Sequence, residues 1–131
     1  GFLGSAGGAF ETEALSIRSS NHYASIMVVA MDGKPLTASG RVLVQCGTIA
    51  RPTGWSAERT DDPERLKITS TGEMPWRMLH LDATLVVRNP GISKATRLDV
   101  MGFPADEVEV RKANGNAVVR LPEKTLFLIL E

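Results

Sequence analysis

Two tryptophans are the residues of this sequence that could bind a ligand by stacking. Trp55 follows Pro52-Thr53-Gly54 and Trp76 follows Gly72-Glu73-Met74-Pro75, so we expect both to lie in loops. A flat indole ring packs well on the CH-rich face of a sugar, which makes both candidates for carbohydrate binding. A loop tryptophan can also fold back and close the open end of a β-sandwich. Aromatic residues make up only 5% of the chain, so few stacking platforms are available.

An acidic segment supplies the oxygen atoms that a metal ion could use. Asp61, Asp62 and Glu64 lie close together in a polar connection and are weak candidates for a calcium site. The Asp-Pro pair in this segment is also typical of a solvated turn, which is the reading we adopt. We therefore predict no metal ion and no cofactor. His80 and Asp82 would share one face of a strand and could form a hydrogen-bonded pair, but two histidines cannot make a typical zinc site alone.

Motifs of catalytic chemistry are missing from the sequence. It has no Gly-x-Ser-x-Gly, Cys-x-x-Cys or His-Glu-x-x-His motif and no phosphate-binding loop. The single cysteine, Cys46, lies in an apolar run and is expected to be a small buried side chain. We assign no catalytic residue and predict that this fragment is not itself an enzyme.

Composition narrows the classes of partner. The 131 residues include 15 basic and 15 acidic side chains without a block of like charge. A nucleic-acid or anionic membrane partner requires a basic stripe or cluster, so we expect neither. The length suits a single domain over residues 1–131. The glycine-rich residues 1–9 are expected to be a flexible entry segment, and we interpret the chain as a fragment of a longer protein.

The elements that must position these residues are predicted to be β-strands. Short apolar runs separated by Gly, Pro and Asn indicate an all-β fold, a sandwich of about nine antiparallel strands. The predicted strands are residues 10–17, 23–31, 40–49, 66–71, 78–88, 96–101, 107–111, 117–121 and 126–130. Asp32-Gly33 and Asn114-Gly115 are predicted turns, and residues 50–65 a long polar connection.

The strand predicted over residues 23–31 is apolar on both faces. One face carries Tyr23, Met27, Val29 and Met31 with Ser25, and the other carries Ala24, Ile26, Val28 and Ala30. A strand of a small sandwich normally has one wet face, as the charged Glu107, Glu109 and Arg111 indicate for residues 107–111. We therefore expect both faces to contact protein. The face with the small alanines, Ala24, Ile26, Val28 and Ala30, is the predicted domain-packing face.

Several segments resemble the β-sandwich domain at the C-terminal end of bacterial glycoside hydrolases, whose catalytic domain is an upstream (β/α)-barrel. The resemblance covers most of the chain from about residue 10, and the matching segments are residues 23–28, 31–36, 39–44, 52–55, 72–75 and 98–102. Met101-Gly102 departs from the Asp-Gly or Asn-Gly turn that such domains tend to have there.

The resemblance implies a non-catalytic accessory domain of a glycoside hydrolase that acts in polysaccharide degradation. Its partner would be the upstream catalytic domain of the same chain, and its location secreted or periplasmic. One alternative is a carbohydrate-binding module that holds a polysaccharide through Trp55 and Trp76. Another is a structural or oligomerisation domain without a carbohydrate role.

Overall fold

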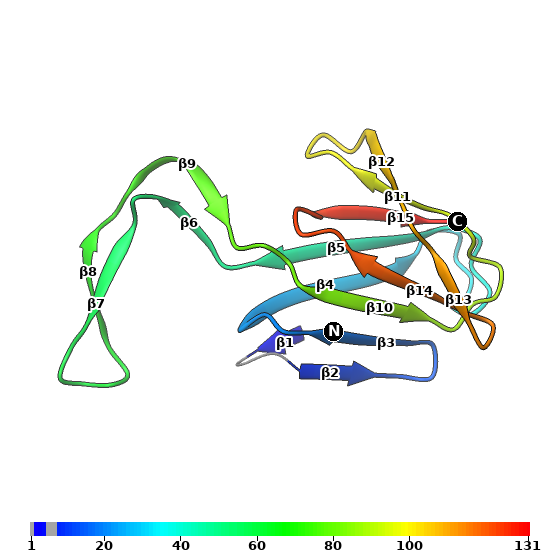
Figure 1. The fold of residues 1–131 in the computed structure, drawn as a ribbon, viewed down its shortest axis with the longest axis horizontal. Helices are drawn as coiled ribbons and strands as arrows, with labels where there is room; N and C mark the ends of the chain where they lie inside the picture. The colour runs from blue at the N-terminus through cyan, green and yellow to red at the C-terminus, as the bar shows by residue number, and fades with distance from the viewer. Residues whose placement is uncertain (1, 5–7) are drawn as a thin grey trace. The chain divides into compact units, whose positions relative to one another are not determined.

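A computed structural model describes residues 2–4 and 8–131, with the backbone alone for residues 2–4. The regular elements of the described residues are strands, β1 to β15, and every paired strand runs antiparallel to its neighbour. The predicted all-β class is therefore confirmed, whereas the strands outnumber the nine expected (Figure 1). No helix in this part of the chain could cross a membrane.

The chain divides into two compact units, which are described separately. The first contains the residues up to Thr48 together with His80–Glu131, and the second is Ile49–Leu79. The prediction of a single domain over residues 1–131 stays a prediction.

The first unit contains a six-stranded and a five-stranded sheet. The six-stranded sheet has the order β1 (Phe2–Gly4), β4 (Tyr23–Ala30), β5 (Val42–Thr48), β15 (Phe127–Leu130), β11 (Ala95–Leu98) and β12 (Pro104–Val108). The five-stranded sheet has the order β13 (Arg111–Ala113), β14 (Asn116–Leu121), β10 (Ala83–Val87), β3 (Leu15–Ser19) and β2 (Gly8–Glu11).

One buried cluster joins these two sheets. Ile26, Val44 and Leu128 come from the six-stranded sheet, while Ile17 and Leu85 come from the five-stranded sheet, and all five are at most 1% exposed. The apolar residues alternate along each strand, so one face of each sheet enters the cluster. The arrangement is sandwich-like.

The chain crosses from one sheet to the other near Glu109. Residues 107–111 were predicted as one strand, but β12 ends at Val108 and β13 begins at Arg111 in the other sheet. The predicted alternation is confirmed, since Val108 and Val110 pack against the core while their charged neighbours are exposed. The prediction of one strand was wrong because buried and exposed side chains keep alternating through the crossover, although the backbone pairs with one sheet before it and with the other sheet after it.

Near the N-terminus, the predicted strand 10–17 and the predicted flexible segment 1–9 both differ from the structure. Residues 10–17 form parts of two strands, because the Thr12 N–H donates to the Leu15 carbonyl (2.8 Å) and turns the chain between β2 and β3. Of the predicted flexible segment 1–9, residues 2–4 lie in β1 and 8–9 in β2, while residues 1 and 5–7 lie outside the described residues.

The Asp32-Gly33 pair begins a longer loop rather than a tight hairpin. Asp32 accepts hydrogen bonds from the Ser39 hydroxyl (2.8 Å) and the Gly40 N–H (2.9 Å), which closes the loop between β4 and β5. Buried Asn89 fixes the same loop by donating to the carbonyls of Leu36 (2.9 Å) and Ser39 (2.8 Å). By contrast, Asn114-Gly115 forms the predicted tight turn, with both φ angles positive (51° and 77°).

The second unit contains two small antiparallel sheets of two strands each, which we together call the ribbon. β6 (Ala50–Thr53) pairs with β9 (Glu73–Met78), and β7 (Ser56–Arg59) pairs with β8 (Leu66–Ser70). Residues 50–65 were predicted as a long polar connection, but residues 50–53 and 56–59 lie in strands that pair with the segment that follows. The two halves of the ribbon approach closely at Gly72, where a Cβ atom would lie 2.6 Å from the Thr53 carbonyl oxygen, so this position requires glycine.

Candidate functional site

The exposed face of β4 is the first candidate surface. Tyr23 is 38% exposed, Met27 45%, Val29 42% and the following Met31 56%. These are large apolar side chains on a strand whose opposite face is already in the core. A row of partly exposed apolar side chains is more typical of a protein contact than of a solvated sheet.

This apolar surface continues across the sheet. Strand register places Val29 beside Leu43 of β5, Leu43 beside Ile129 of β15, and Phe127 beside Leu98 of β11. Directly paired residues of an antiparallel sheet share a face. We call this surface the apolar sheet face, defined by Tyr23, Met27, Val29, Met31, Leu43, Leu98, Phe127 and Ile129. Polar Gln45, which pairs with both Met27 and Phe127, interrupts it, and Ile129 is only 9% exposed.

Charged pairs border the apolar sheet face at one end. Arg41 Nε lies 3.4 Å from Glu131 Oε1, and Lys94 Nζ lies 3.0 Å from Glu107 Oε1. All four side chains are solvent-exposed, so these pairs contribute little to stability. An apolar centre with a charged rim is the usual layout of a protein–protein interface.

The predicted domain-packing face is the wrong face of β4. Ala24 is 0% and Ile26 1% exposed in the core of the chain, and Val28 and Ala30 on the same face are half-buried. Their cross-strand partners Cys46, Val44 and Val42 are buried as well, so the five-stranded sheet covers this face. The prediction failed because the small alanines indicate close packing, and this packing occurs within the chain.

The hairpin between β11 and β12 presents a second apolar feature. Val100 is 74%, Met101 76% and Phe103 66% exposed. Asp99 holds the tip, because its Oδ1 accepts the N–H groups of Met101 and Phe103, each at 2.9 Å. These apolar side chains are thus displayed on an ordered turn.

The ribbon also exposes several large apolar side chains. Cross-strand pairing places Trp76 beside Pro52 and Met78 beside Ala50, while Leu66 and Ile68 share a face with Ala57. Trp76 is 57%, Leu66 61% and Ile68 58% exposed. A two-stranded hairpin is marginal in water by itself, so covering these side chains would stabilise the ribbon.

The two tryptophans have different environments. Trp76 lies in β9 rather than in a loop, and its indole is largely exposed. Trp55 lies between β6 and β7, is half-buried, and has the Arg51 guanidinium 4.6 Å from its ring centroid. A cation over the ring occupies one indole face. The structure therefore leaves Trp76 as the more accessible of the two for stacking.

The acidic residues of the connection are used in local turn contacts. Asp62 accepts the Glu64 N–H at 3.0 Å through Oδ1, and its Oδ2 lies 3.1 Å from Arg65 Nε. Within the described residues, no group of three or more His, Cys, Asp or Glu side chains could hold a metal ion, so Asp61, Asp62 and Glu64 do not form such a group. His80 pairs with Glu123 (3.0 Å) rather than with Asp82.

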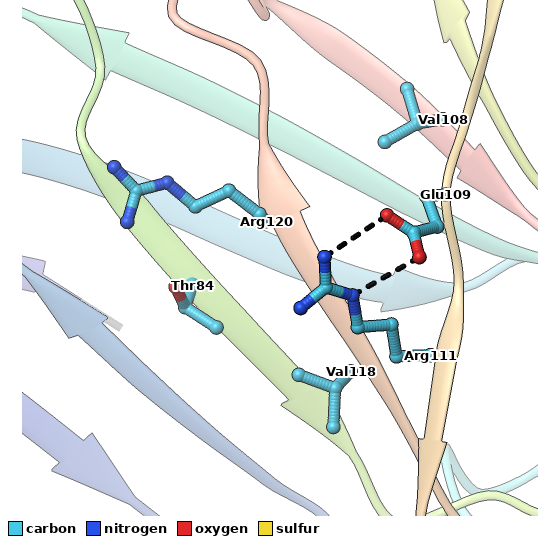
Figure 2. A pocket seen from close by; sticks show the side chains of 6 residues that line it. All are labelled: Thr84, Val108, Glu109, Arg111, Val118 and Arg120. Carbon is cyan, nitrogen blue, oxygen red and sulfur yellow. Dashed lines mark hydrogen bonds and ion pairs between the residues drawn. The ribbon is translucent and has the colours of Figure 1, made fainter.

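A polar hollow lies on the outer face of the five-stranded sheet (Figure 2). It has a volume of about 480 Å³ and is lined by Thr84, Val108, Glu109, Arg111, Val118 and Arg120. Glu109 and Arg111 form a forked pair, with Nε–Oε1 3.1 Å and Nη2–Oε2 3.3 Å. This contact lowers the pKa of Glu109 and raises the pKa of Arg111, so both groups stay charged.

The cysteine plays the structural role expected of it. Cys46 is 4% exposed, and burial raises the pKa of its thiol to about 12. The thiol is therefore protonated at neutral pH and a poor nucleophile.

Sequence reasoning did not find the hairpin tip or the polar hollow. The run Val100-Met101-Gly102-Phe103 was a signal for the tip, since three large apolar side chains surround a turn glycine. The hollow has no local signal, because its residues come from segments that only the fold brings together. Comparison with protein-family models, with curated proteins and with solved structures gave no match to this chain.

Proposed function

We propose that this chain is a non-catalytic accessory β-sandwich domain that docks on an upstream catalytic domain of the same parent protein. The apolar sheet face is the observation that carries this proposal. Met27 and Val29 of β4 and the following Met31 are between 42% and 56% exposed, although β4 lies between β1 and β5 within the sheet. Covering such a half-exposed side chain recovers roughly 1 kcal/mol, and several act together.

The kind of partner follows from the sequence resemblance. Domains similar to this one occur behind the catalytic barrel of bacterial glycoside hydrolases, and the resembling segments 23–28 and 39–44 include most of β4 and the start of β5. Tyr23, Met27, Val29 and Leu43 of the apolar sheet face lie on these strands. Docking there would hold the accessory domain beside the barrel and add no reacting group to the active site.

A charge placed in the apolar sheet face tests the proposal. In the parent protein, Met27→Lys is expected to release the domain from the catalytic domain. The release would be detected as faster cleavage of the chain between these two domains in limited proteolysis. The isolated chain should unfold at an unchanged temperature, because Met27 lies outside the core. Ser16→Lys, on the outer face of the five-stranded sheet, is the matched control and should change neither property.

Two results would contradict the proposal. One is a parent sequence without a catalytic barrel upstream of this domain. The other is a Met27→Lys parent protein that resists proteolysis as well as the unmodified protein does.

The exposed indole of Trp76 favours a second candidate function, a carbohydrate-binding module. Such a module would bind glycans as an isolated chain and lose binding on Trp76→Ala, whereas Trp55→Ala would have a smaller effect because Arg51 covers one face of that ring. A glycan array on the isolated chain separates the two functions, since docking alone predicts no binding through Trp76.

A further inference from the structure

A row of three polar side chains crosses the outer face of the five-stranded sheet. Thr84 of β10 lies directly opposite Arg18 of β3 on one side and Arg120 of β14 on the other. Neighbouring strands are about 4.8 Å apart, so two arginines flank one threonine over about 10 Å.

Two open hollows meet at this row. The hollow in Figure 2 includes Thr84 and Arg120 at one side and Arg111 at the other. A second hollow of about 260 Å³ shares Thr84 and Arg120 and extends to Arg18, Ser20 and Asp82. Together they form a polar groove, which we call the arginine groove.

The arginine groove has unmatched positive charge. Its two carboxylates are already engaged, since Glu109 pairs with Arg111 and Asp82 accepts bonds from Arg120 and Ser20. Arg18 has no carboxylate partner among the described residues. Three guanidinium groups thus face two carboxylates, and donors of Arg18 and Arg120 remain available for an anion.

We infer that the arginine groove binds an acidic saccharide, with its carboxylate or sulfate between Arg18 and Arg120. Guanidinium groups bind both anions through paired N–H donors, and the Thr84 hydroxyl lies between the two arginines. Val118 and Val108 offer apolar contact for a sugar ring beside the charged groups. The anion follows from the arginines, while the saccharide class rests on the proposed function.

Titration of the isolated chain tests this site. The probes are a galacturonate oligomer, a sulfated glycosaminoglycan fragment and a neutral cello-oligosaccharide. Binding of each probe is measured by NMR or calorimetry. An acidic oligomer is expected to bind, more weakly at high salt, whereas the neutral one does not bind. The carboxylate and sulfate probes distinguish the two anions.

Arg18→Gln should weaken this binding by about tenfold or more, because one charged hydrogen-bonding group is removed. Arg77→Gln is the matched control, since Arg77 is an exposed arginine of β9 in the other unit. Trp76→Ala should also leave the affinity unchanged, which separates this site from the tryptophan module. Unfolding curves verify that each variant is folded.

The inference is overturned if neither acidic oligomer binds, or if Arg18→Gln binds as tightly as the unmodified chain. A DNA oligonucleotide that binds as tightly as the acidic saccharides overturns the saccharide assignment. Docking through the apolar sheet face does not involve Arg18, so failure of this site and failure of the proposed function are separate results.

Discussion

Ile26 and Met27 are neighbours in β4 but face opposite sides of the six-stranded sheet. Ile26 is 1% exposed in the core, whereas Met27 is 45% exposed. The strand is therefore apolar on both faces for two different reasons. One face makes the fold, and the other is free to bind a partner.

Truncations on the two faces should differ in cost. Ile26→Ala is expected to lower the free energy of unfolding by about 2–5 kcal/mol, because it leaves a cavity in the core. Val29→Ala on the exposed face should cost less than about 1 kcal/mol. Urea unfolding of the isolated chain measures both values. Equal costs would show that the two faces have been assigned incorrectly.

The loop between β4 and β5 should depend on pH through Asp32. Hydrogen bonds from the Ser39 hydroxyl and then the Gly40 N–H lower the pKa of this carboxyl below its ordinary 3.8. Its stabilising effect is therefore fully present above pH 3.8 and is lost as the pH falls through the lower folded-state pKa. Thermal unfolding of the unmodified chain and of Asp32→Asn should differ at neutral pH and converge in acid. A gap that persists at the acid limit would contradict this role.

The ribbon should be sensitive to substitution at Gly72. Gly72 (φ +70°) and Gly54 (φ +75°) share a left-handed backbone, but only at Gly72 would a Cβ atom meet neighbouring atoms, at 2.6 Å and 2.7 Å from Thr53 and Trp55. Gly72→Ala should therefore increase amide hydrogen exchange in β6 and β9 far more than Gly54→Ala does. The core around Leu85 should keep its protection in both variants. Equal effects would mean that backbone strain, rather than the close contact, decides the outcome.

A buried hydroxyl offers a stabilising substitution. Thr125 is 3% exposed, and its Oγ1 has no hydrogen-bond partner among the described residues. Thr125→Val should leave stability unchanged or raise it by about 1 kcal/mol, since it removes an unsatisfied polar atom. Ser39→Ala is the control and should lower stability, because the Ser39 hydroxyl bonds to Asp32 and the Arg41 carbonyl. A clear loss of stability in Thr125→Val would reveal a partner for that hydroxyl.

The sequence predicts β4 well because a mostly apolar stretch of eight residues is a local property. It does not show which face of β4 enters the core, because both faces are apolar and the choice depends on pairing with distant strands. Residues 50–53 and 56–59 look like a polar connection for a similar reason. These residues form strands because they pair with residues 66–78, and their sequence has no alternation of apolar and polar side chains that would predict a strand.

The candidate sites follow the same division. The run around Met101 can be found in the sequence, whereas the arginine groove cannot. Arg18, Thr84 and Arg120 are far apart along the chain, and only the strand order β14-β10-β3 aligns them. Local patterns thus predict exposed tips and strands, while sites on a sheet face depend on topology.

Oxidative footprinting of Met27 and Met31 tests the docking claim most directly. Both side chains are largely exposed in this chain, at 45% and 56%, and should be oxidised readily when it is isolated. In the parent protein, both side chains are expected to become protected, while Met101 of the hairpin between β11 and β12, which is 76% exposed and lies outside the apolar sheet face, should be oxidised equally in the two samples. Oxidation of Met27 and Met31 at the same rate in the parent protein and in the isolated chain would contradict docking through the apolar sheet face.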